Sequence, residues 1–222
     1  MSSPHPRLYA VWMSDRSYDD ACGLARALDA VGERWTLLIV RELLLGPKRF
    51  NDLKSGLSGP SQNVLTQRLR ELEQAGLVRR TILGPPASVR VYELTDRGLQ
   101  LEPSLLELSR WGARTSPRPD ASESVDAFAL SLRALYSGNP VRPAVTLSVD
   151  GDFIEACARE GALMMRRVGS PGSTTITGSL SDFRIAVWGE RPASVSALPD
   201  SLRVDGEVDL AVSFLNSFRG DA

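Results

Sequence analysis

Residues 61–98 read SQNVLTQRLRELEQAGLVRRTILGPPASVRVYELTDRG, and this stretch decides how the first half of the chain folds. Leu65, Leu69 and Leu72 lie within an arc of about 60° when residues are placed roughly 100° apart, as on an α-helix. Ser61 precedes them and is one of the residue types that cap helix N-termini. The stretch therefore predicts an amphipathic helix that buries its leucines.

The sequence pattern changes after Gly76, a residue type that commonly follows the last turn of a helix. Residues 77–83 and 89–94 are rich in Val, Ile, Thr and Tyr, which favour strands. Between them, residues 84–88 read GPPAS, which is a loop longer than a tight turn. We expect a β-hairpin here, directly after the helix.

Further helices are predicted on both sides of this stretch. Upstream, the apolar spacing indicates helices at 24–31, 35–45 and 50–57, and the second is apolar nearly all round and therefore buried. Downstream, Thr95 caps a leucine-rich helix in which Pro103 should cause a kink. The order helix, turn, helix, hairpin predicts a winged helix-turn-helix.

The exposed face of the helix after Ser61 carries side chains that can read DNA. Asn and Gln can bond adenine N6 and N7 together, and Arg can bond guanine O6 and N7. A helix fits the major groove, and its N-terminal turns approach the bases first. A plain solvated helix would more often carry Lys and Glu, so the amides favour base reading. The predicted base-reading residues are Ser61, Gln62, Asn63, Thr66, Gln67 and Arg70.

Basic residues flank this helix in the sequence. Each could be an ordinary exposed charge, but together they would place positive charge where DNA phosphates pass. Residues 21–115 hold 14 Lys and Arg against 10 Asp and Glu, whereas residues 116–222 hold 10 against 14. The near-neutral total therefore hides two unlike halves. The predicted phosphate contacts are Lys48, Arg49, Arg79, Arg80 and Arg90.

The chain is long enough for two domains and has an α+β pattern overall. We expect a partly disordered leader at 1–20, a DNA-binding and dimerisation domain at 21–115, a linker at 116–122 and a second domain at 123–222. The leader has no apolar run of the kind found in secretory signals, and no stretch is apolar enough to span a membrane. These features predict a cytoplasmic protein without membrane association.

The second domain itself is predicted to be α+β. The turn at 150–152 between two apolar runs indicates a hairpin, and helical patterns occur near 125–135, 179–188 and 207–218. The single histidine is His5 in the leader, so no Ser-His-Asp or Cys-His set can form. Carboxylates are scattered near turns, which does not suggest metal ligation. We therefore expect no enzyme activity, no cofactor and no metal.

Several motifs resemble the HxlR family of winged-helix regulators, in matching order over about 95 residues. The resemblance implies a homodimer that binds double-stranded DNA and acts as a repressor or an activator. It also places helices near 21–31 and 99–111 in the dimer interface. The motifs are CGLARAL (22–28), GERWTLLI (32–39), GPKRFNDL (46–53), VLTQRLRELE (64–73), GLVRR (76–80), YELTDRG (92–98) and WG (111–112).

Cys22 raises a separate question. Members of the HxlR family commonly have Pro after the first cysteine, where this chain has Gly23, and in some members this cysteine senses oxidants or electrophiles. Arg26 is the only cation about one turn on, although a helix N-terminus can itself lower a thiol pKa. The sequence favours an inert thiol and leaves a redox switch through Cys22 as an alternative.

Two stretches of the second half, TTITGSLSDF (174–183) and LRVDGEVDLAVSF (202–214), resemble the sterol-carrier-protein-2-like fold. The resemblance implies an α/β domain with about five strands and an apolar tunnel for a small, lipid-like ligand. Such a domain would sense that ligand or aid assembly. Alternatively, its apolar residues simply fill a core, or the chain is a lipid carrier with vestigial DNA binding. The candidate lining residues, chosen by type, are Phe128, Phe153, Met164, Met165, Phe183 and Trp188.

Overall fold

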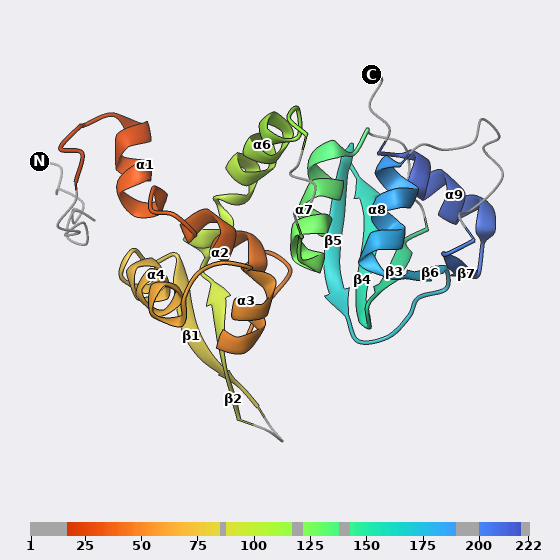
Figure 1. Cartoon of the computed structure of the whole chain (residues 1–222), viewed down its shortest axis with the longest axis horizontal. Coiled ribbons are helices and arrows are strands. Elements are labelled where there is room, and N and C mark those ends of the chain that lie inside the picture. Colours follow the sequence, from red (N-terminus) through yellow and green to blue (C-terminus); the bar gives the residue numbers. More distant parts are fainter. Residues whose placement is uncertain (1–16, 85–87, 117–121, 138–142, 190–199, 219–222) are drawn as a thin grey trace, which may run out of the picture. The chain divides into compact units, whose positions relative to one another are not determined.

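The chain folds into two compact units, residues 1–102 and 103–222, each with its own core (Figure 1). This is a computed structural model. The division between the units lies at the start of α6 (Glu102–Gly112). The boundaries expected from the sequence, with a linker at 116–122, stay predictions. The structure describes residues 17–84, 88–116, 122–137, 143–189 and 200–218.

The first unit is a set of helices followed by a two-stranded hairpin. The predicted order is confirmed within the described residues. The elements are α1 (Gly23–Val31), α2 (Thr36–Leu43), α3 (Phe50–Gly56), α4 (Gln62–Gln74), β1 (Val78–Leu83), β2 (Val89–Leu94) and α5 (Asp96–Leu99). Its core is built from one apolar face of each helix, and every such leucine stabilises the fold by roughly 1.5–3 kcal/mol. Side chains with no exposed surface include Ile39, Val40, Leu53, Leu65, Leu69 and Leu72.

Both ends of α4 are set by the residues that the sequence indicates. The Ser61 hydroxyl accepts a hydrogen bond from the Val64 N–H at 3.3 Å, which satisfies one open donor of the first turn. At the other end Gly76 has a left-handed φ of +67°. The Leu77 N–H then donates to the Leu72 carbonyl at 2.9 Å. The helix therefore stops there, and the chain turns directly into β1.

A buried carboxylate joins α2 to the turn before α3. Glu42 has no exposed surface, and its Oε2 lies 2.7 Å from Lys48 Nζ while its Oε1 lies 2.9 Å from Arg41 Nη2. The two cations compensate the cost of burying the charge. Gly56 of α3 lies so close that a Cβ there would collide with the carboxylate. The contact between α2 and α3 therefore depends on a glycine at this position.

The predicted kinked helix after Thr95 is wrong in one respect. Thr95 does cap a helix, because its Oγ1 accepts from the Gly98 N–H at 3.2 Å. That helix, α5, ends at Leu99, and a separate helix, α6, starts at Glu102. Pro103 therefore lies in the first turn of α6, where a missing N–H breaks no helical hydrogen bond. A break between two helices replaces the kink.

The second unit is a mixed five-stranded sheet with helices. Its elements are α6, α7 (Val125–Leu135), β3 (Val145–Val149), β4 (Asp152–Arg159), β5 (Ala162–Val168), β6 (Thr175–Gly178), α8 (Leu180–Trp188), β7 (Arg203–Asp205) and α9 (Val208–Asn216). The strand order is β5-β4-β3-β6-β7, in which β3 and β6 are parallel and the other pairs antiparallel. The hairpin expected around residues 150–152 is confirmed as β3 and β4, whereas β7 has only three residues and so shows no clear alternation.

The core of the second unit lies between its sheet and helices. Leu147 of β3 is paired with Ile154 of β4 in the strand register, and neither side chain has exposed surface. Phe128 of α7 packs near Phe183 of α8, with ring centroids 6.1 Å apart, and both are fully buried. Arg110 of α6 donates through Nε to the Ala134 carbonyl of α7 at 2.7 Å. The unit is thus held by apolar burial and by contacts between successive helices.

Candidate nucleic-acid interface

The helix α4 presents its polar side chains on the side opposite its buried leucines. The structure thereby brings together Asn63, Gln67 and Arg70, as the helical period predicts. All three are exposed, and the described residues offer Arg70 no ion-pair partner. Amide and guanidinium groups on one exposed helix face can form paired hydrogen bonds with base edges.

The remaining predicted base-reading residues have their polar atoms partly engaged within α4. The Ser61 oxygen accepts the capping hydrogen bond, which uses one of its two acceptor positions. Thr66 is half-buried and donates its hydroxyl hydrogen to the Gln62 carbonyl at 2.8 Å. Gln62 is exposed at the first turn. The hydroxyl groups of Ser61 and Thr66 are therefore less available for base reading than the side-chain amide of Gln62.

Ion pairs fix both flanks of α4. On one flank Arg68 pairs with Glu71 and, at 3.0 Å, with Glu33. On the other, Glu73 lies 2.9 Å from Arg80 Nε of β1. The sequence reasoning missed these partners, although the spacings of three and four residues along α4 would have indicated the pairs within the helix.

The wing formed by β1 and β2 separates the predicted phosphate contacts. Arg80 faces Tyr92 and Arg90 faces Ile82 in the strand register, so these two arginines share one face of the hairpin. Arg79 lies on the other face, with Nε 2.7 Å from a Glu93 oxygen. All three arginines are exposed. The structure therefore brings together Arg80 and Arg90 but not Arg79.

Lys48 and Arg49 differ sharply in their surroundings. Arg49 is exposed at the start of α3, where its N–H donates to Asp52. The Lys48 side chain is only 11% exposed, because its ammonium pairs with the buried Glu42. The Lys48 ammonium therefore neutralises a core carboxylate, and its contact with a phosphate stays a prediction. The turn was informative, but the buried partner could not be seen in the sequence.

Cys22 is exposed at the N-terminus of α1. The backbone N–H groups of Ala25 and Leu24 lower the pKa of its thiol, and the charge of Arg26 adds a smaller effect in the same direction. Slight desolvation opposes them. Within the described residues Sγ accepts no full capping hydrogen bond, so the effect comes from N–H groups that only approach the sulfur. The thiolate is favoured here beyond what the sequence suggests.

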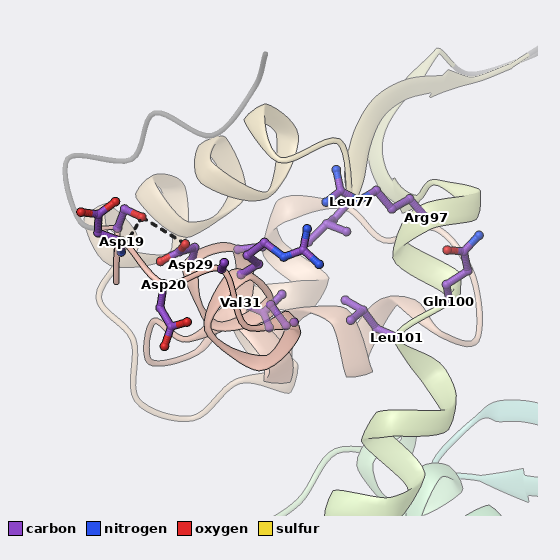
Figure 2. A pocket seen from close by; sticks show the side chains of 14 residues that line it. Asp19, Asp20, Asp29, Val31, Leu77, Arg97, Gln100 and Leu101 are labelled. Atoms are coloured by element: carbon purple, nitrogen blue, oxygen red, sulfur yellow. Dashed lines mark hydrogen bonds between the residues drawn. The ribbon is translucent and has the colours of Figure 1, made fainter. Parts of the chain in front are cut away.

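A pocket of about 810 Å³ opens between α1 and α5 (Figure 2). Asp19, Asp20 and Asp29 gather toward one end, whereas Arg97 and Gln100 lie toward the other. Its apolar lining includes Val31, Leu77 and Leu101. This pocket could not be predicted from the sequence, because its walls come from segments about 70 residues apart.

The six apolar residues proposed for a ligand tunnel do not face one space. Phe128, Phe183 and Met165 lie in the core, and Trp188, 39% exposed, contacts Phe128 with ring centroids 5.3 Å apart. Phe153 and Met164 alternate with buried residues of β4 and β5, so they lie on the opposite face of the sheet. The expected single lining is therefore wrong, because strand alternation divides residues that were chosen by type alone.

Among the described residues, no group of three or more His, Cys, Asp or Glu side chains could hold a metal ion. No helix in that part of the chain is long and apolar enough to cross a membrane.

Comparisons with known proteins agree with the geometry of the first unit. The model of the family described as "HxlR-like helix-turn-helix" matches residues 30–120. The uncharacterized HTH-type transcriptional regulator YvaP of Bacillus subtilis (strain 168) is 44% identical over 87 residues, which are 39% of this chain and 80% of that protein.

Solved structures of similar proteins include two regulators. The reduced form of the transcriptional regulator YodB from B. subtilis is 33% identical, with a TM-score of 0.39, and the match covers 45% of this chain and 98% of that chain. The redox regulator HypR in its oxidized form is 33% identical, with a TM-score of 0.39, and the match covers 44% and 100%. The sterol-carrier-like reading of residues 123–222 lies outside the region that the family model matches. The identity with YvaP over most of its length, together with the helix-turn-helix and wing, shows that this chain belongs to the HxlR-like helix-turn-helix family of transcriptional regulators.

Proposed function

We propose that the chain is a sequence-specific regulator that binds duplex DNA as a homodimer, with α4 in the major groove. One observation carries the proposal: Asn63, Gln67 and Arg70 stand together on the exposed face of α4, directly opposite three fully buried leucines. Asn and Gln suit adenine, and Arg suits guanine. Arg49, Arg80 and Arg90 would contact phosphates beside the groove, because these exposed charges lie on elements next to α4.

The homodimer is supported by apolar surface that each chain leaves exposed. Within its own chain α1 buries only Val31, while Leu24 is 68% exposed. On α6, Leu108 is 50% and Trp111 72% exposed. Burying such side chains against a second copy would be favourable by roughly 1.5–3 kcal/mol for each one fully covered. A two-fold dimer requires a pseudo-palindromic site with half-sites about one or two helical turns apart.

The decisive experiment is selection of duplexes from a random pool by the full chain, followed by competition with scrambled duplex. We expect enrichment of a pseudo-palindrome that binds at least about 10³-fold more tightly than scrambled DNA at physiological salt. A triple variant, Asn63→Ala with Gln67→Ala and Arg70→Ala, should keep its fold and lose the enrichment. No enrichment by the wild-type protein would contradict the proposal.

A second candidate function, control by oxidants through Cys22, is favoured by the exposed thiol and its lowered pKa. A quinone or peroxide should then weaken operator binding by the wild type and by Cys157→Ser, but not by Cys22→Ser. Equal responses of the wild type and Cys22→Ser would remove Cys22 as the sensor.

For the second unit we propose binding of a small apolar ligand, or a role in assembly. Its support is the cluster in which the half-exposed Trp188 contacts the buried Phe128. A ligand that binds only the native state raises thermal stability in proportion to RT ln(1 + [L]/Kd). Fatty acids and sterol-like compounds should therefore raise the Tm of the full chain, and Trp188→Ala should reduce the shift. The absence of any shift across such compounds would argue for a core without a ligand.

A further inference from the structure

Gln67 is held in one orientation by a residue one helical turn further on. Its Nε2 donates a hydrogen bond to Glu71 Oε1 at 2.9 Å. A carboxylate accepts hydrogen bonds and donates none, so only the nitrogen end of the Gln67 amide can face Glu71. The contact therefore fixes which way round the amide lies.

Glu71 is itself held in place by Arg68, which lies on the flank of α4 and not on its exposed face. Its second oxygen, Oε2, accepts a hydrogen bond from Arg68 Nη1. Arg68 Nη2 in turn lies 3.0 Å from an oxygen of Glu33, a residue between α1 and α2. The Arg68 side chain is only 18% exposed, so surrounding protein restricts it. Gln67 thus stands at the outer end of a polar chain, Glu33–Arg68–Glu71–Gln67, that is anchored beyond α4.

We propose that Glu71 is a positioning residue that makes Gln67 specific for adenine, an inference that rests on the proposed DNA-reading function. Gln67 Nε2 carries two hydrogens. In the proposed arrangement Glu71 takes the hydrogen that points away from Oε1, so that the other stays beside Oε1. The free edge of the amide then offers one acceptor and one donor side by side.

This free edge matches adenine and mismatches guanine. In the major groove adenine presents the N6 donor next to the N7 acceptor, so both atoms of the Gln67 edge find a partner. Guanine presents two acceptors, O6 and N7, so Gln67 Oε1 would face an acceptor without a hydrogen between them. Without Glu71, the Gln67 side chain could swing so that Nε2 alone donates to guanine O6 or N7 while Oε1 faces water. Glu71 opposes this movement, because it would break the hydrogen bond to Nε2 or bring Oε1 against the carboxylate.

Two substitutions separate this role from a general effect of charge. Glu71→Gln keeps the size of the side chain but offers both a donor and an acceptor, so either orientation of Gln67 finds a partner. Glu73→Gln is the matched control, because it removes the same charge from the same helix where the partner is Arg80, not Gln67. Both positions are partly exposed, so neither change should unfold the helix.

The experiment is selection from random duplexes with the full chain, for the wild type, Gln67→Ala, Glu71→Gln and Glu73→Gln. Affinities are then measured for duplexes that differ at a single base pair. The ratio of affinities for A·T and G·C at that pair cancels any change in overall charge. The wild type should prefer A·T at one position of each half-site by about 10-fold or more.

Gln67→Ala should abolish this preference, and Glu71→Gln should reduce it by about threefold or more at the same position only. Glu73→Gln should leave the ratio unchanged. If Gln67→Ala relaxes the position but Glu71→Gln preserves the full ratio, the positioning role is overturned while the proposed function survives. If Gln67→Ala relaxes a position that is not A·T, the adenine assignment is overturned. If the wild type selects no sequence at all, the proposed function itself fails.

Discussion

Arg70 of α4 and Arg80 of β1 have different surroundings. Arg70 is on the exposed face of α4 without an ion-pair partner among the described residues, whereas Arg80 pairs with Glu73 and lies over the Tyr92 ring, 5.2 Å from its centroid. A base-reading arginine discriminates between sequences, and a phosphate-binding arginine does not. Substitutions of the two residues therefore distinguish base reading from phosphate binding.

We expect Arg70→Ala to cost roughly 1–3 kcal/mol of binding free energy on the selected duplex and to relax preference at one base pair. Arg80→Ala should weaken selected and scrambled duplexes alike and reduce the slope of log affinity against log salt by about one. Salt titrations of both duplexes provide the measurement. The reverse pattern would mean that the two roles are exchanged.

The thiol of Cys22 yields a pH prediction. Because the nearby N–H groups lower its pKa, more thiolate is present at a given pH in the folded protein than in the unfolded chain. In a Cys157→Ser background, the rate of alkylation should therefore rise at lower pH for the folded protein than for the same protein in urea. Coincident pH profiles would show that the helix start does not act on the thiol.

Among the elements, α4 and the two strands that follow it could be predicted because the signals that set them act within a few residues. The leucine spacing, the Ser61 cap and the Gly76 turn each name a position, and all three are confirmed. The break before α6 was missed, since Pro103 suits either a kink or a first turn. The pairing of Lys48 with Glu42 was missed because burial of a carboxylate depends on tertiary packing.

The buried pair between α2 and the turn before α3 gives a stability prediction. Lys48→Met removes one of the two cations beside Glu42, and loss of a partner from a buried ion pair costs roughly 3–5 kcal/mol. The control is Arg49→Met, at an exposed neighbouring position, which should change the free energy of unfolding by less than about 0.5 kcal/mol. Urea denaturation followed by tryptophan fluorescence measures both. Similar costs for the two variants would contradict the role assigned to Lys48.

For the whole molecule, the exposed apolar residues of α6 predict self-association. Leu108→Asp places a charge on that surface, so the dimer should dissociate at concentrations where the wild type remains associated. Ile185→Asp is the matched control, because Ile185 is 60% exposed on α8, which the proposed interface does not include. Sedimentation equilibrium distinguishes them. A wild-type monomer, or equal effects of the two variants, would contradict the proposed dimer.

The residues expected to line a tunnel were chosen by type, and residue type does not tell on which face of a sheet a side chain lies. Strand alternation places Phe153 and Met164 on one face of the sheet and Met165 on the other. Composition alone does not give the phase of that alternation, because a shift by one residue exchanges the faces. The site on α4 was accessible to sequence reasoning because a single helix carries it, whereas a cavity needs several elements placed together.

The root of the wing gives the molecule a mechanical property. Lys48 exchanges two backbone hydrogen bonds with Tyr92, at 3.0 and 2.8 Å, so the turn before α3 grips β2 from the side. The hairpin is therefore attached to the rest of the first unit at this pair of hydrogen bonds. Because the side chain of the same lysine pairs with Glu42, a displacement of the hairpin would also shift that buried carboxylate. A duplex that displaces the wing would therefore strain the core of the first unit at the Lys48–Glu42 pair.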